Sequence, residues 1–121
     1  MARDTILVVE DSPIELRLLA ESLAEHGYRV VTAVDGEDAL QKVAHERPRL
    51  IVLDVVLPRK SGFQVCRQLK AAADTRDIKI VLVTGKHTES DRYWGLKQGA
   101  DDYMIKPVAD EDLLASVARL L

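Results

Sequence analysis

Five short apolar runs, separated by segments with helical periodicity, constrain the fold of this 121-residue chain more than any other feature. The runs are β-branched or aliphatic and do not alternate with polar residues, a pattern typical of strands buried on both faces of a parallel sheet. Strand and helix alternate five times, which predicts an α/β fold with right-handed crossovers. The expected strands are residues 5–9, 30–33, 50–53, 80–83 and 103–105.

The segment between the fourth and fifth expected strands is the weakest helix candidate. Thr88 and Asp91 fit a variant capping box at its start, but its apolar stripe, Tyr93 and Leu96, is thin. Gly95 lies inside this segment, where glycine costs about 0.5–1 kcal/mol relative to alanine. We therefore expect a helix of marginal stability here.

Length and composition exclude several classes of protein. A domain typically takes about 100–200 residues, so we expect a single domain over residues 1–121. The net charge of −3 disfavours a nucleic-acid surface, and the one cysteine, Cys66, excludes an internal disulfide framework. No apolar run approaches the roughly 20 residues needed to span a bilayer, and the N-terminus lacks a signal peptide. We therefore expect a cytoplasmic protein without membrane insertion.

Polar side chains collect where the expected strands end. Glu10 and Asp11 follow the first strand, Asp54 follows the third, Thr84 the fourth and Lys106 the fifth. Ligands of open parallel sheets bind outside the carboxyl ends of the strands. If the first and third strands are neighbours, three carboxylates meet there beside a lysine and a hydroxyl group.

Carboxylates held this close repel one another, and a cation or a proton must relieve the repulsion. An all-oxygen cluster suits Mg²⁺, and a carboxylate beside Mg²⁺ can attack a phosphoryl group. Taken singly, each residue has a simpler explanation: Glu10 and Asp11 could cap the first helix, and Asp54 could be a turn residue. Taken together, four strand ends with suitable side chains favour a phosphoryl-transfer site, with Asp54 attacking and Lys106 holding the phosphoryl oxygens.

The pattern resembles the receiver domain of bacterial two-component response regulators, of the stand-alone chemotaxis type. The resemblance covers essentially the whole chain. It implies a flavodoxin-like (βα)5 fold with strand order 2-1-3-4-5, helices on both faces of the sheet and a cis Lys106–Pro107 bond. The motifs that carry it are residues 8–12 (VVEDS), 54–58 (DVVLP), 61–62 (SG), 83–84 (VT), 99–103 (GADDY) and 106–107 (KP).

The resemblance also implies the ligands of a cofactor, Mg²⁺. These would be the carboxylates of Glu10, Asp11 and Asp54 together with the backbone carbonyl of Val56. Asp54 would be the phosphoacceptor and would receive its phosphoryl group from a histidine kinase. The family is not enzymatic beyond this self-phosphotransfer and the subsequent loss of the phosphate.

Three further residues have roles implied by the family. Lys106 would pair with the phosphate, Thr84 would move to hydrogen-bond it, and the switch aromatic Tyr103 would turn inward. The change would reach the surface of the fourth helix, fifth strand and fifth helix. Trp94 on the fourth helix is either an exposed anchor for a partner or a side chain folded over the neighbouring surface.

Residues 91–100 (DRYWGLKQGA) narrow the resemblance to the small receivers of type IV pilus systems that control twitching motility or phototaxis. The expected partners are a histidine kinase and a downstream signalling or motility protein, with the chain a monomer or weak dimer. Two other functions stay open at this point. One is a degenerate receiver that serves as a constitutive docking module. The other is a small flavodoxin-like enzyme, which no glycine-rich cofactor loop supports.

Overall fold

The computed structural model describes residues 4–86 and 88–121 and contains one five-stranded parallel sheet of order β2-β1-β3-β4-β5. This confirms the expected fold class and strand order, and Lys106–Pro107 is cis as the resemblance implied. The expectation that the N-terminus lacks a signal peptide involves residues 1–3, which lie outside the described residues. The strands are β1 (Thr5–Val9), β2 (Arg29–Ala33), β3 (Leu50–Leu53), β4 (Lys79–Thr84) and β5 (Asp102–Ile105).

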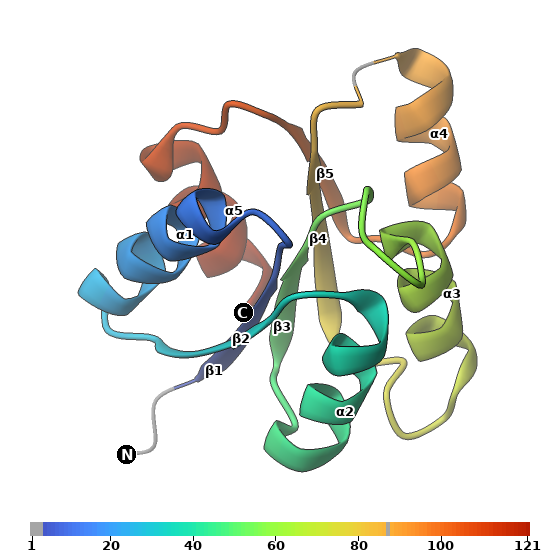
Figure 1. Ribbon diagram of the computed structural model, residues 1–121, viewed down its shortest axis with the longest axis horizontal. Helices are drawn as coiled ribbons and strands as arrows, with labels where there is room; N and C mark the ends of the chain where they lie inside the picture. The colour runs from blue at the N-terminus through green and yellow to red at the C-terminus, as the bar shows by residue number, and fades with distance from the viewer. Residues whose placement is uncertain (1–3, 87) are drawn as a thin grey trace.

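Helices cover both faces of the sheet (Figure 1). One layer holds the first and last helices, α1 (Pro13–Glu25) and α5 (Asp110–Leu120). The opposite layer holds α2 (Gly36–Glu46), α3 (Gly62–Ala71) and α4 (Glu89–Lys97). Within the described residues, no helix combines the length and the apolar character that crossing a membrane requires.

The central strands are buried on both faces because successive side chains point to opposite sides of the sheet. In β3, Leu50 and Val52 pack in the cluster that includes Leu23 of α1, whereas Ile51 and Leu53 pack in the cluster of α2 and α3. This explains why the strands appear in the sequence as continuous apolar runs.

Burial also raises the pKa of the Cys66 thiol, on α3, to about 11.

The loop after β3 is shaped by a glycine. A Cβ atom on Gly62 would lie 2.2 Å from the carbonyl oxygen of Asp54, so no larger residue fits there. The Gly62 N–H donates to the Val55 carbonyl at 2.9 Å, and Ser61 caps the helix that begins at this glycine. The chain beside Asp54 is therefore held tightly against the start of α3.

Helix α4 differs from its expected packing. Its capping box is present, with the Asp91 N–H donating to Thr88 Oγ1 at 3.0 Å. The expectation that Tyr93 and Leu96 form the apolar stripe is wrong, since these side chains are 63% and 40% exposed and Gly95 is the buried residue of the helix. The physical reason is close approach, because the helix lies against the sheet where only a glycine fits.

The neighbours of Gly95 are side chains of the sheet. A Cβ atom on Gly95 would lie 2.8 Å from Tyr103 Cδ2 and 3.0 Å from Leu82 Cδ1. The cost of glycine in a helix is thus offset by packing against the Tyr103 ring.

Gly95→Ala tests this packing. Alanine should gain about 1 kcal/mol of helix propensity but overpack the contact with Tyr103, which typically costs about 1–3 kcal/mol. We expect a lower free energy of unfolding in urea. Gly85→Ala is the matched control, because a Cβ atom there meets nothing within 4 Å. A Gly95→Ala protein more stable than the wild type would contradict the close-packing explanation.

Candidate functional site

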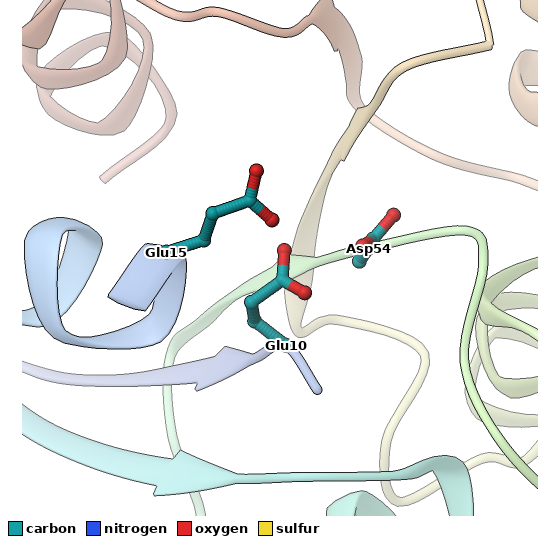
Figure 2. Close-up of side chains that lie close together, drawn as sticks. All are labelled: Glu10, Glu15 and Asp54. Carbon is teal, nitrogen blue, oxygen red and sulfur yellow. The ribbon is translucent and has the colours of Figure 1, made fainter. Parts of the chain in front are cut away.

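Glu10 and Asp54 continue two adjacent strands by one residue each. The Asp54 N–H donates to the Val9 carbonyl at 3.0 Å, and the Glu10 N–H donates to the Ala33 carbonyl at 3.1 Å. Because β1 and β3 are paired, the two carboxylates emerge side by side at the carboxyl edge of the sheet (Figure 2). Glu10 is 1% exposed and Asp54 is 7% exposed.

Lys106 supplies the positive charge of the site. Its ammonium group donates to Glu10 Oε1, to Glu15 Oε2 at 2.8 Å and to Asp54 Oδ2 at 3.0 Å. The Lys106 backbone N–H donates to the Thr84 carbonyl at 2.9 Å, which fixes the lysine at the end of β5. One ammonium group therefore faces three carboxylates.

Glu15 is the residue that sequence reasoning missed. One carboxylate oxygen from each of Glu10, Glu15 and Asp54 lies within 4.8 Å of the others. Figure 2 shows Glu15 reaching toward the other two from the first turn of α1. Its position in that turn, four residues after Asp11, was the available signal.

Two of the predicted Mg²⁺ ligands, Glu10 and Asp54, belong to this carboxylate cluster. The structure brings Glu10 and Asp54 together, whereas Asp11 is exposed between β1 and α1 and is not in the carboxylate group. Val56 is exposed, and its N–H donates to Asp54 Oδ1 at 3.2 Å. Carboxylate oxygens are the ligands that Mg²⁺ prefers, so the chemistry of the cluster fits this ion. The ligand set of Glu10, Asp11, Asp54 and the Val56 carbonyl stays a prediction.

Burial and ion pairing shift the titration of these groups. Desolvation raises the pKa of Glu10 to about 7, although its hydrogen bond from Lys106 acts in the opposite direction. The hydrogen bond from Lys106 lowers the pKa of Glu15. Desolvation alone would lower the pKa of Lys106, but the bonds to the three carboxylates outweigh it and raise that pKa. The lysine therefore stays charged.

A hydrogen-bonded path leads from the site toward α4. Thr84 is fully buried, and its Oγ1 accepts the Lys86 N–H at 3.2 Å. The Lys86 carbonyl accepts the Tyr103 hydroxyl at 2.7 Å. Tyr103 is 3% exposed and thus lies inward, against Gly95. One residue of the loop after β4 thereby contacts both expected switch side chains.

Several large apolar or aromatic side chains of α4 and β5 are exposed. Trp94 is 55% exposed, which favours the exposed alternative over a side chain folded onto its neighbours. Tyr93 and Leu96 of the same helix and Ile105 of β5 are also exposed. Lys97 Nζ lies 5.9 Å from the centroid of the Tyr93 ring, a cation–π contact.

Asp54→Asn should stabilise the protein in the absence of Mg²⁺. The change leaves two carboxylates around Lys106, and the relief of like-charge repulsion should raise Tm by about 3–6 °C, or about 1 kcal/mol. Thermal unfolding in EDTA measures this shift. Asp74→Asn, at an exposed residue between α3 and β4, is the charge-matched control. An unchanged or lower Tm for Asp54→Asn would contradict the repulsion.

The chain matches a known protein family. The family model of the response regulator receiver domain matches residues 6–118. The chain is 42% identical over 121 residues to Protein PilH of Pseudomonas aeruginosa, covering all of this chain and 98% of that protein. It is 46% identical over 116 residues to Response regulator MprA of Mycolicibacterium vanbaalenii, covering 96% of this chain but only 49% of that protein. The chain thus spans about half the length of MprA.

The solved structures agree with this result. The chemotaxis response regulator CheY4 of Vibrio cholerae superposes with a TM-score of 0.92 at 29% identity. The superposition covers 99% of this chain and 100% of that one. Five parallel strands in the order β2-β1-β3-β4-β5 carry the strand-end residues expected of this family. The chain belongs to the response regulator receiver domain family.

Proposed function

We propose that the chain is a phosphorylation-dependent signalling switch of a two-component system, acting in the cytoplasm as a single receiver domain over residues 1–121. Asp54 accepts a phosphoryl group from a histidine kinase. The observation that carries this proposal is the Asp54 carboxylate at the carboxyl edge of the sheet, hydrogen-bonded to the Lys106 ammonium at 3.0 Å. The chain transforms no external substrate beyond this self-phosphotransfer and the later loss of the phosphate.

The transfer step follows from these groups. An Asp54 oxygen attacks phosphorus, an O–P bond forms, the P–N bond to the donor imidazole breaks and the imidazole keeps the bonding electron pair. Lys106 turns from the carboxylates toward the phosphoryl oxygens and offsets their charge. Mg²⁺, held by the predicted ligands Glu10, Asp11, Asp54 and the Val56 carbonyl, supplies further positive charge when bound.

The surface beside Asp54 suits a protein donor. Ile14 and Leu18 on α1 are 73% and 62% exposed, one helical turn apart. A groove of about 620 Å³ lies between α1 and the start of α5, and Leu18 and Lys106 both line it. An apolar surface beside the phosphoacceptor supports docking of a histidine kinase there.

Transmission of the signal would use Thr84 and Tyr103. If Thr84 turns its hydroxyl to the phosphoryl group, it releases the Lys86 N–H that it now accepts. The Lys86 carbonyl also accepts a hydrogen bond from the Tyr103 hydroxyl. A shift of Lys86 would therefore change the hydrogen bond that holds the Tyr103 ring against Gly95 of α4. Short helices with few buried side chains are the elements that move most readily, and α4 buries only Gly95.

The output would be a contact between proteins. The exposed side chains of α4 and β5, with Trp94 among them, form a surface for a downstream signalling or motility protein. The similarity to PilH over the whole chain supports control of pilus-based motility as the pathway. We propose that the protein acts as a monomer or weak dimer.

A second function is a constitutive docking module that no longer responds to phosphate. The buried Asp54, the paired Lys106 and the hydrogen-bonded Thr84 argue against it, because each has the environment that phosphoryl transfer needs. A docking module requires none of these polar groups to be buried.

Incubation with acetyl phosphate and Mg²⁺ separates the two functions. A switch should gain one phosphoryl group by intact mass spectrometry, and Asp54→Asn should gain none. Asp74→Asn, which leaves the site intact, should be phosphorylated like the wild type. A wild-type protein without any mass shift would favour the docking module.

Trp94→Ala tests the output surface. Because Trp94 is 55% exposed, its removal should leave phosphorylation of Asp54 and the free energy of unfolding nearly unchanged. Binding of a downstream partner, measured with beryllofluoride-activated protein, should weaken by about tenfold or more, as for an aromatic anchor. Loss of phosphorylation in this variant would instead indicate a folding role for the tryptophan.

A further inference from the structure

Glu15 lies at the third helical position of α1, where it completes the sequence pattern of a capping box with Ser12. In a capping box the glutamate would accept the backbone N–H of the capping residue. Here Glu10 Oε2 accepts the Ser12 N–H at 3.0 Å instead. The Glu15 carboxylate is therefore released from helix capping and pairs with Lys106 at 2.8 Å.

The three carboxylates around Lys106 differ in their access to solvent. The side chains of Glu10 and Asp54 are 1% and 8% exposed, whereas that of Glu15 is 46% exposed. Glu15 is therefore the most exposed carboxylate of the cluster, and Figure 2 shows it reaching toward the other two from α1. The Glu15 carboxylate also accepts a hydrogen bond from the Lys106 ammonium group, which an incoming phosphoryl group would need.

We propose that Glu15 is a positioning residue that competes with the phosphoryl group for Lys106 and sets the charge balance of the site. This rests on the proposed function. In the unphosphorylated protein the Glu15 carboxylate holds Lys106 toward α1. On phosphorylation, Lys106 must leave that carboxylate, and the added negative charge must be accommodated beside it.

The proposal predicts opposite effects on anions and cations. A carboxylate at the rim repels a phosphoryl-like anion and attracts a divalent cation. Removing its charge should strengthen binding of the anion and weaken binding of Mg²⁺. A glutamate needed only for folding would weaken both when it is replaced.

Glu15→Gln is the test variant, because glutamine keeps the length and a hydrogen-bond acceptor for Lys106. Beryllofluoride affinity is measured by ¹⁹F NMR at saturating Mg²⁺, and Mg²⁺ affinity is measured separately by calorimetry. At low ionic strength we expect beryllofluoride to bind about three- to tenfold more tightly and Mg²⁺ about two- to fivefold more weakly. Both changes should shrink in high salt, since Glu15 is partly exposed.

Glu21→Gln is the matched control. Glu21 lies on the same helix and pairs with Arg17 at 2.8 Å, so its replacement changes the net charge equally without touching Lys106. Its two affinities should match the wild type within about twofold.

The outcomes separate the two proposals. If the wild type fails to bind beryllofluoride at saturating Mg²⁺, the proposed function is wrong and the role of Glu15 fails with it. If the wild type binds but Glu15→Gln behaves like Glu21→Gln, the role of Glu15 alone is overturned. Weaker binding of both ligands, with a lower free energy of unfolding in urea, would overturn it in favour of a structural role.

Discussion

The arrangement of a single ammonium group among three carboxylates organises the rest of this structure. Lys106 follows β5, Asp54 follows β3 and Glu10 follows β1, so one cation joins the carboxyl ends of three strands. Three carboxyl groups around one ammonium group repel one another when they are ionised, and the pKa of Glu10 is raised to about 7 by burial. In the proposed function, a divalent cation would offset the negative charge of this cluster, and a phosphoryl group would draw Lys106 away from it.

Much of the fold follows from the amino-acid sequence because its signals are local. Buried parallel strands read as unbroken apolar runs, and the ends of such strands must lie at one edge of the sheet. Glu10, Asp54, Thr84 and Lys106 could therefore be placed near one another without coordinates. The cis Lys106–Pro107 bond was expected from the family motif and was confirmed.

The direction of individual side chains and the close approach of a helix to the sheet could not be predicted from the sequence. Asp11, a predicted Mg²⁺ ligand, is exposed and lies outside the carboxylate cluster, whereas Glu15, which was not among the expected residues, pairs with Lys106 while Glu10 accepts the Ser12 N–H. Which acidic side chain near the start of a helix faces inward depends on which hydrogen-bond donors its neighbours occupy in the folded protein. In the same way, the sequence indicates only that Gly95 lowers the helix propensity of α4. The close packing of Gly95 against Tyr103, which accounts for a glycine at this position, is visible only in the structure.

The close approach of Gly62 to the Asp54 backbone makes the two flanks of the site unequal. A would-be Cβ atom on Gly62 would lie 2.2 Å from the Asp54 carbonyl oxygen, so the start of α3 packs tightly against the backbone of Asp54. On the other side, Gly85 stands in open space between Thr84 and Lys86. The packing is therefore tight on the α3 flank of Asp54 and open at Gly85 in the loop after β4. If the switch proposed above operates, this asymmetry favours movement of the loop after β4, beside the β4–β5 edge of the sheet, over movement of α3.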